Sequence, residues 1–425
     1  MKTAISRAFG AVAIVAAALV VSPAPASAKI EGITGPNFHL SAKPGFISTP
    51  DGGSIYMWGY ADQNGGGVMQ YPGPTLIVNV GDTVTVTLDN YLDTPTSAVF
   101  PGLAPVAIGG VPGILTNEAP AVAAGTAGTV TYTFQASRPG TFTYYSGTRP
   151  DLQVEMGLVG ALIVRPAAGA GQAYDDPSTK FDREYLFLLT EIDPAIHNSV
   201  LWGFASLVDT SQWWPLWWMI NGRSAPDTMH EAHVPWLPNQ PYNCMPLLHP
   251  QDKILLRFIG GNREPHPFHV HGQHARIVAH DARPLASVAG GTIDLAQLTF
   301  TRTVAPGETE DAIYSWSGQG LGWDIYGHKS SDPIRPEELA ADHGKPFPVD
   351  LPPELDQNVG EFWSGSPFLG AMIGMAPGLG VQNEMGDYTF MWHSHDEKEM
   401  TNNNVFPGGM MTMLMVQHPD KMIME

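Results

Sequence analysis

The stretch His266-Pro267-Phe268-His269-Val270-His271-Gly272 decides the fold, and it contains three histidines within six residues. It follows the apolar run at residues 254–259, an order that is typical of a β-strand leading into metal ligands. Side chains on a strand alternate between its two faces, so His269 and His271 point to the same side. Neutral imidazole is a good ligand for copper, zinc, iron and nickel. One such pair is weak support for a metal site, because histidines are also ordinary strand residues.

A second pair with the same spacing, His393 and His395, follows Phe390-Met391-Trp392 near the end of the chain. If the two strands are neighbours, four imidazoles meet in one small volume. Burying that many polar rings without a bound partner is costly. We therefore expect the two pairs to hold one metal ion together. The alternative is a group of histidines satisfied by hydrogen bonds and water alone.

The first 28 residues have the pattern of a secretory signal peptide. Lys2 and Arg7 flank the start, an apolar run follows at residues 11–21, and Ala26-Ser27-Ala28 matches the A-x-A cleavage pattern. The apolar run is too short to span a membrane, and no later stretch is long and apolar enough to do so. We expect a mature chain that starts near Lys29 and is exported to the periplasm, the cell surface or the extracellular medium.

Charge and cysteine content narrow the function classes. Without residues 1–28 the chain carries 19 Lys and Arg against 41 Asp and Glu, a net charge of −22. This excess of acids argues against nucleic-acid binding, which needs cationic groups for the phosphates. It suits a partner that is a metal ion or a small-molecule substrate. Cys244 is the only cysteine, so an intramolecular disulfide is excluded.

Composition also favours an all-β sandwich architecture over helices, because 46 glycines and 38 prolines separate many short β-branched runs. We expect an N-terminal domain at residues 29–166, where Val84, Val86 and Leu88 alternate with threonines as in a half-buried strand. Residues 167–180 are predicted to be a linker. Residues 181–425 then form a second domain that carries both histidine pairs. That domain contains an irregular insertion at about residues 318–384.

These features together resemble the multicopper oxidase family, which is built of cupredoxin β-sandwiches. Pro72-Gly73-Pro74-Thr75 and Gly81-Asp82 resemble the opening of the family's first domain. The stretch at residues 266–272 resembles the H-P-x-H-x-H copper motif almost residue for residue. His393-Ser394-His395, followed by Gly409-Met410, resembles the H-C-H…G-M motif near the end of such proteins. The resemblance implies two cupredoxin-like Greek-key β-sandwiches and a copper cofactor. Many two-domain members assemble into homo-trimers with copper between subunits, and the oligomeric state of this chain stays open between that and other states.

One departure from the family concerns the blue copper site. The middle residue of H-C-H is the thiolate ligand of that copper, whereas this chain has Ser394, and a hydroxyl is a poor substitute for a thiolate. The next histidine of the same site aligns on or near Glu399, which leaves only His266 and Met410. We therefore expect no blue copper. His266 is then either an additional ligand of the metal centre or a group on the opposite face of the strand.

A second departure concerns oxygen reduction. The family's first domain supplies two further H-x-H pairs to a three-copper cluster. At the corresponding positions this chain has Val99-Phe100-Pro101-Gly102 and Tyr145-Ser146-Gly147. All four histidines are missing, so the family's four-electron reduction of oxygen is not expected here.

Three functions remain open on the residues alone, because function depends on the site and not on the fold. The first is an oxidoreductase that acts through a mononuclear copper held by His269, His271, His393 and His395. The second is a protein that binds or stores copper without turnover. The third is a scaffold or interaction protein of the cell envelope. An open coordination position favours the first, and the donor set also suits zinc.

Overall fold

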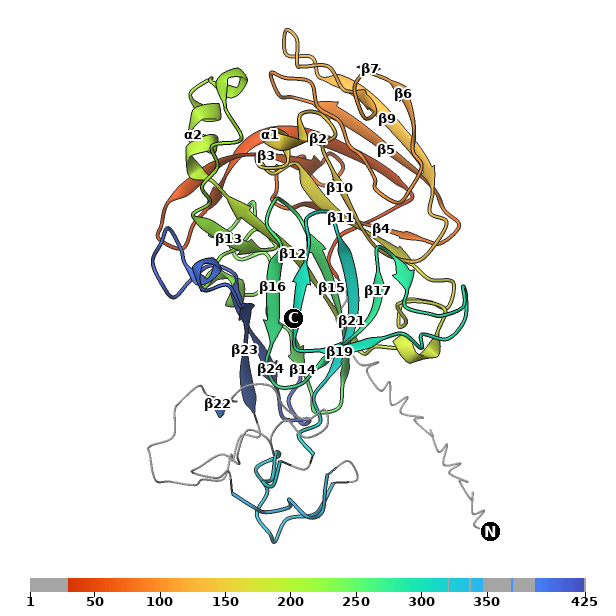
Figure 1. Cartoon of the computed structure of the whole chain (residues 1–425), viewed down its shortest axis with the longest axis vertical. Helices are drawn as coiled ribbons and strands as arrows, with labels where there is room; N and C mark the ends of the chain where they lie inside the picture. Colours follow the sequence, from red (N-terminus) through yellow and green to blue (C-terminus); the bar gives the residue numbers. More distant parts are fainter. Residues whose placement is uncertain (1–29, 320, 336–337, 347–367, 370–386, 424–425) are drawn as a thin grey trace, which may run out of the picture.

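The computed structural model describes residues 30–319, 321–335, 338–346, 368–369 and 387–423. Two β-sandwiches account for most of these residues and lie one above the other in Figure 1. The prediction of an all-β chain with two sandwiches is therefore confirmed. The expected signal peptide, residues 1–28, lies outside the described residues.

The first sandwich packs a four-stranded sheet against a five-stranded sheet. The four-stranded sheet consists of β1 (Ile33–Thr34), β4 (Gly73–Asn79), β11 (Val159–Arg165) and β10 (Gly140–Tyr145). The five-stranded sheet consists of β3 (Ser54–Asp62), β2 (Asn37–Ser48), β5 (Thr83–Asn90), β9 (Gly128–Gln135) and β6 (Val106–Gly109). A short ribbon, β7 (Val111–Pro112) with β8 (Asn117–Glu118), and helix α1 (Pro150–Gln153) complete it. The alternation predicted for β5 is confirmed, because Val84, Val86 and Leu88 are all buried in the core between the sheets.

The second sandwich pairs a seven-stranded sheet with a six-stranded sheet. The larger sheet consists of β13 (Trp217–Ile220), β12 (Arg183–Ile192), β15 (Lys253–Gly260), β21 (Thr309–Ser315), β17 (Ala275–His280), β18 (Arg283–Pro284) and β19 (Gln297–Thr299). The smaller one consists of β14 (Leu247–Leu248), β24 (Met411–Val416), β23 (Tyr388–Ser394), β22 (Phe368–Leu369), β16 (His266–Val270) and β20 (Thr301–Val304). Short helices lie in the connections: η1 (Pro177–Thr179), α2 (Pro194–Leu201), η2 (Ala205–Leu207), η3 (Asp227–Met229) and η4 (Glu397–Met400).

The two sandwiches pack face to face through strands that are covered on both sides. All residues of β11 and of β12 are buried. Leu162 and Val164 of β11 face the core of the first sandwich. The intervening residues Ala161 and Ile163 join Leu188 of β12 in an apolar cluster between the sandwiches. Burial on both faces explains why these strands are continuous apolar runs in the sequence.

A buried polar network also joins the sandwiches. Arg257 of β15 donates from Nε to Glu184 Oε2 at 3.1 Å and from Nη1 to Thr141 Oγ1 at 2.9 Å. Glu184 accepts a further hydrogen bond from Arg165 of β11, and Asp311 Oδ1 lies 3.5 Å from Arg257 Nη1. Burial raises the pKa of Glu184, but the two guanidinium groups outweigh burial and hold that pKa below its ordinary value. Glu184 is therefore a charged carboxylate that is paired on both sides.

The predicted insertion, about residues 318–384, is described only in part. Residues 321–335 and 338–346 form turns and bends, and β22 pairs with β23. The rest of the insertion lies outside the described residues. The predicted linker, residues 167–180, connects β11 to β12 and contains η1. Within the described part of the chain, no helix is both long and apolar enough to cross a membrane.

Candidate metal centre

The two histidine pairs lie on neighbouring strands. β16 pairs with β23 in antiparallel fashion, and the register places His269 directly opposite His393. Phe268 on β16 and Trp392 on β23 point into the core of the second sandwich. Because side chains alternate along a strand, His269 and His393 point to the outer face of the six-stranded sheet. The convergence expected from the sequence therefore follows from strand order, register and alternation.

The four imidazoles form one compact group, which we call the histidine centre: His269, His271, His393 and His395. The ring centres of His269 and His271 are 4.6 Å apart, and His269 lies 5.1 Å from His395. The two Nε2 atoms of His271 and His393 face each other at 3.2 Å. Metal–nitrogen bonds of about 2 Å in a tetrahedral arrangement place neighbouring ring centres roughly 5 Å apart. The ring centres thus have the spacing of a four-coordinate centre.

Hydrogen bonds fix the outer nitrogens of two of these rings. His269 Nδ1 lies 2.6 Å from Thr301 Oγ1 of β20, and His393 Nδ1 lies 2.6 Å from the carbonyl oxygen of Ser394. The carbonyl oxygen of Ser394 can only accept, so it places the proton of neutral His393 on Nδ1, and the Thr301 hydroxyl orients the ring of His269. The backbone at His271 is held as well, because Tyr314 Oη donates to its carbonyl oxygen at 3.0 Å.

The protonation state of the centre suits metal binding. Burial, together with the neighbouring imidazoles, lowers the pKa of His269 to about 3 and that of His271 to about 4. Burial also lowers the pKa of His393. These three rings are neutral at pH 7, which leaves lone pairs available for a metal ion. His395 is exposed, so the centre is open to solvent on one side.

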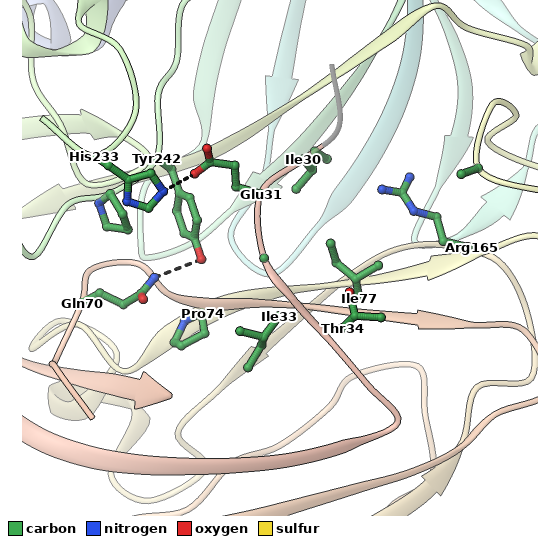
Figure 2. Close-up of a pocket in the computed structure, with 13 residues that line it drawn as sticks. Ile30, Glu31, Ile33, Thr34, Gln70, Pro74, Ile77, Arg165, His233 and Tyr242 are labelled. Carbon is green, nitrogen blue, oxygen red and sulfur yellow. Dashed lines mark hydrogen bonds and ion pairs between the residues drawn. The ribbon is translucent and has the colours of Figure 1, made fainter. Parts of the chain in front are cut away.

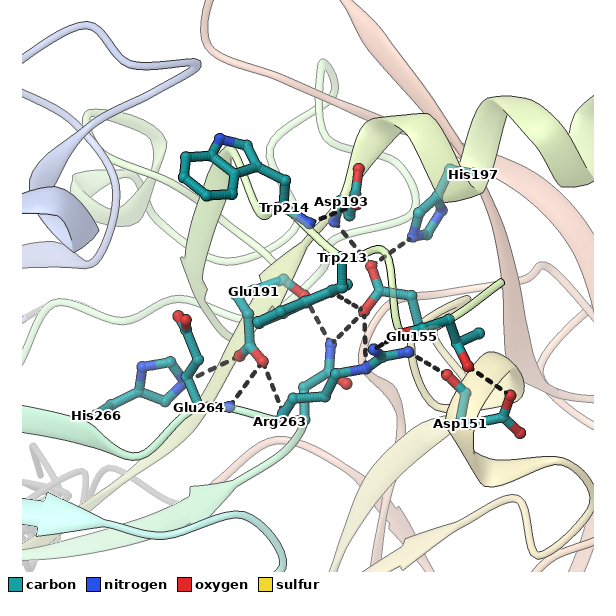
Figure 3. A network of polar contacts seen from close by, with 12 residues as sticks. Asp151, Glu155, Glu191, Asp193, His197, Trp213, Trp214, Arg263, Glu264 and His266 are labelled. Carbon is teal, nitrogen blue, oxygen red and sulfur yellow. Dashed lines mark hydrogen bonds and ion pairs between the residues drawn. The ribbon is translucent and has the colours of Figure 1, made fainter. Parts of the chain in front are cut away.

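His266 lies on the opposite face of β16 and does not join the histidine centre. Its Nε2 lies 3.0 Å from Glu191 Oε2, and its Nδ1 lies 3.0 Å from Glu399 Oε2. Figure 3 shows Glu191 between His266 and the backbone of Arg263 and Glu264. Both ring nitrogens are therefore committed to carboxylates, and none is left for a metal. Of the two roles expected for His266, the geometry favours a group on the other face over an additional ligand.

The pH dependence of stability tests this arrangement. Burial opposes protonation of His266, but the hydrogen bonds to Glu191 and Glu399 outweigh it and raise its pKa from 6.5 to about 10. A raised pKa stabilises the folded state below pH 6.5, and that stabilisation is lost as the pH rises toward 10. We expect the free energy of unfolding to fall by on the order of a few kcal/mol across this window. Denaturant titrations of the metal-free protein at pH 6.5 and pH 9.5 measure it.

In the same titrations on His266→Asn, the free energy of unfolding should fall much less between pH 6.5 and pH 9.5. The matched control is His39→Ala, which removes a partly exposed histidine of the first sandwich and its ion pair with Asp89. In that control, the free energy of unfolding should fall with pH as it does in the parent protein. An equal fall in the parent and in His266→Asn contradicts a charged His266.

Ser394 occupies the position between the two histidines of the second pair. It is fully buried, and its Oγ accepts a hydrogen bond from the backbone N–H of Asp396 at 3.2 Å. Its own N–H donates to the carbonyl oxygen of Met410 at 2.9 Å.

In the first sandwich, Val99 and Tyr145 pair across an isolated bridge. The two segments that the resemblance aligns with further copper ligands are thus adjacent, but they contain no histidine.

A separate cavity of about 690 Å³ lies beside the N-terminal end of the described chain (Figure 2). Ile33, Gln70 and Tyr242 contribute to its lining, and His233 Nε2 lies 2.7 Å from Glu31 Oε2 at its edge. None of the histidines of the centre lines it. The cavity is therefore not the candidate metal site.

Three partners of these histidines were not identified from the sequence. Thr301 and Glu191 lie on distant strands, and their proximity depends on how β20 and β12 are placed in the fold. From the sequence, Glu399 aligns with a missing histidine and is a candidate to tune or complete a metal site; the structure places it against His266. Its pairing with His266 could have been suspected, because a buried carboxylate needs a cationic neighbour.

Comparisons with known proteins agree with the fold. Residues 54–169 match the family model of multicopper oxidases. Copper resistance protein A from Pseudomonas syringae pv. tomato is 25% identical over 284 residues, which cover 59% of this chain and 44% of that protein. The solved multicopper oxidase mgLAC is 18% identical with a TM-score of 0.55, and the match covers 92% of this chain and 88% of that one. The blue copper oxidase from Nitrosomonas europaea is 20% identical with a TM-score of 0.53, covering 89% and 85%.

These matches show a multicopper oxidase-like chain built of cupredoxin-like β-sandwiches, as the resemblance implied. The matched proteins are copper proteins by name. The aligned part spans less than half the length of copper resistance protein A. The solved structures, at this level of identity, support the fold alone.

Proposed function

We propose that this multicopper oxidase-like chain is an exported oxidoreductase that holds a single copper ion in the histidine centre. The observation that carries the proposal is the group of four converging imidazoles on β16 and β23, three of them neutral at pH 7. Neutral imidazole nitrogens suit copper. The names of the matched family and relatives favour copper over zinc. Export is supported by the signal-peptide pattern at residues 1–28.

Copper, when bound, supplies one-electron redox chemistry between its two common oxidation states. The chain supplies the donors and their orientation. Thr301 and the carbonyl of Ser394 hold the rings of His269 and His393 in fixed orientations. Exposure of His395 leaves the centre open to a small substrate or a metal ion, which favours turnover over a closed structural site.

The proposed chemistry is narrower than that of a complete multicopper oxidase. The family's thiolate position holds Ser394, and the positions of its first-domain cluster hold Val99 and Tyr145 in place of histidines. We propose that the chain lacks both the blue copper and the three-copper cluster. Four-electron reduction of oxygen is then outside its range, and a mononuclear copper acts alone.

Steady-state oxidation of ascorbate tests the catalytic part of the proposal. The copper-loaded, dialysed full chain should oxidise ascorbate to dehydroascorbate while reducing oxygen by two electrons to hydrogen peroxide, faster than the same protein after treatment with a chelator. Stoichiometric copper binding without turnover would instead assign the chain to copper binding or storage. Full folding without any copper uptake would leave the scaffold function.

A further inference from the structure

We propose that Asp324, His328, Glu338 and His343 form a second metal site, specific for a divalent cation of the zinc class. These residues lie in the described part of the insertion, in the loops at the bottom of Figure 1 beyond the start of β23. The site shares no residue with the histidine centre. We call it the insertion site.

The four side chains offer ligand atoms to one common point. One ligand atom from each residue lies within 4.8 Å of all the others. His343 Nδ1 is 2.8 Å from Glu338 Oε1, and His328 Nδ1 is 3.2 Å from Glu338 Oε2. Both Nδ1 atoms also lie 3.6 Å from Asp324 Oδ2. Two nitrogens and two carboxylate oxygens around one point are a common donor set for zinc.

The charges at the insertion site match a divalent cation. The side chains of Asp324 and Glu338 are nearly inaccessible to solvent, with exposed fractions of 0% and 2%. Hydrogen bonding to Glu338, together with the charges of Glu338 and Asp324, raises the pKa of His343 above its ordinary value. Without a metal, a proton on His343 therefore balances part of the carboxylate charge. Metal binding displaces such protons, and the four ligands then carry a charge of −2, which one divalent cation neutralises.

Backbone groups orient both carboxylates. Asp324 accepts hydrogen bonds from the N–H of Tyr326 at 2.9 Å and from that of Gly344 at 2.7 Å. Glu338 Oε2 accepts from the N–H of Arg335 at 3.0 Å. Gly344 has a φ of 70°, a conformation that favours glycine over residues with a side chain. The donor atoms are thus positioned before a metal arrives, which lowers the entropic cost of binding.

A second cluster in the same sandwich shows what a carboxylate–histidine group looks like when it already has a cation. His280 lies near Glu308 and Glu310, and the ligand atoms of all three are equally close together. There the guanidinium of Arg302 pairs with both glutamates. Burial also raises the pKa of Glu310 to about 8, so Arg302 balances the remaining charge of Glu308, and the cluster provides an internal control.

A metal bound at the insertion site would cross-link residues 324 and 343 within a segment of turns and bends. The single cysteine of the chain permits no internal disulfide that could do the same. This segment contacts the second sandwich, because Trp323 Nε1 donates to Tyr388 Oη of β23 at 3.2 Å. The mixed nitrogen and oxygen donors suit zinc, and the imidazoles of the histidine centre suit copper as well as zinc; the proposed function assigns copper to that centre. The chain would thus hold two different metals at two places.

Zinc binding to the full chain with the histidine centre removed tests the proposal. In the His269→Ala/His393→Ala background we expect one tightly bound zinc per chain after dialysis, measured by elemental analysis. Adding Glu338→Gln or His343→Gln should weaken zinc binding by about 100-fold, since even indirect partners of a metal ligand contribute 10–100-fold. Adding His280→Gln should leave the zinc content unchanged. Circular dichroism checks that each variant folds.

Limited proteolysis gives a second readout that does not require counting bound zinc. Zinc should protect residues 318–346 in the background protein and in His280→Gln, but not in Glu338→Gln. X-ray absorption at the zinc edge should show only nitrogen and oxygen ligands, including imidazole. A folded background protein that binds no zinc overturns the proposal. Equal zinc content with and without Glu338→Gln overturns it as well, and then the cluster is an ion-pair group of imidazolium and carboxylate only.

Discussion

Replacing His269 and His393 together with alanine is expected to abolish copper binding by the full chain. The two residues face each other across β16 and β23 and contribute one imidazole from each pair. Two ligands that remain on adjacent strands cannot surround a metal ion. The apparent affinity should fall by more than about 100-fold, since loss of a direct ligand exceeds loss of its hydrogen-bond partner. Competition with a chromogenic copper chelator measures this change.

The matched control for this experiment is His39→Ala. His39 is a partly exposed histidine of β2 that pairs with Asp89 in the first sandwich, far in sequence from both pairs. Its removal should leave copper affinity unchanged. A double variant of the centre that is folded and still binds copper with the parent affinity would place the metal elsewhere.

Replacing Arg257 with methionine is expected to cost about 3–5 kcal/mol of stability. Arg257 is completely buried and lies between Glu184 and Asp311 at the contact of the two sandwiches. Methionine has a similar length and keeps the packing, but it leaves two buried carboxylates without their shared cation. Denaturant unfolding followed by tryptophan fluorescence gives the free energy of unfolding.

The control for Arg257→Met is Arg149→Met. Arg149 pairs with Asp151 at 3.5 Å, and both side chains are more than 40% exposed. Exposed pairs contribute between about 0 and 1 kcal/mol, so this variant should be close to the parent. A loss below 1 kcal/mol for Arg257→Met would show that the buried network does not hold the sandwiches together.

The strand elements were predictable because each has a periodic pattern. Val84, Val86 and Leu88 alternate because β5 is buried on one face, and the alternation indicates a strand directly. β12 is buried on both faces, so its apolar run marked a strand without showing which face meets the other sandwich. The sequence alone predicts that the two histidine pairs meet if β16 and β23 are neighbours, but it does not show that they are. The register that places His269 opposite His393 depends on long-range packing, which local patterns do not encode.

The groups around the histidines were harder to predict than the histidines. A strand pattern places His266 and His269 on opposite faces, which the structure bears out. It does not reveal that Glu191 and Glu399 enclose His266, because these residues are 75 and 133 positions away. The insertion was predicted to be irregular, and composition gave no sign of its cluster. Asp324, His328, Glu338 and His343 have no short motif spacing, so only the folded loops bring them together.

The position that the family resemblance assigns to the blue copper now has a different chemistry. Ser394 and Met410 are buried there, and His266 bridges two carboxylates. A buried imidazolium between two glutamates supplies positive charge at this position. The second face of the same strand keeps the imidazoles that suit a metal. β16 thus carries His266, which pairs with two carboxylates, on one face and the histidines of the centre on the other.

Copper content and spectroscopy of the mature, copper-loaded protein test the central claim most directly. We predict about one copper per chain in the four-imidazole centre, with nitrogen hyperfine structure in the electron paramagnetic resonance spectrum. No intense blue thiolate band is expected, because Ser394 stands at the thiolate position. An intense blue band, or three to four coppers per chain, contradicts a mononuclear histidine site. Failure of the folded protein to bind copper contradicts the account as a whole.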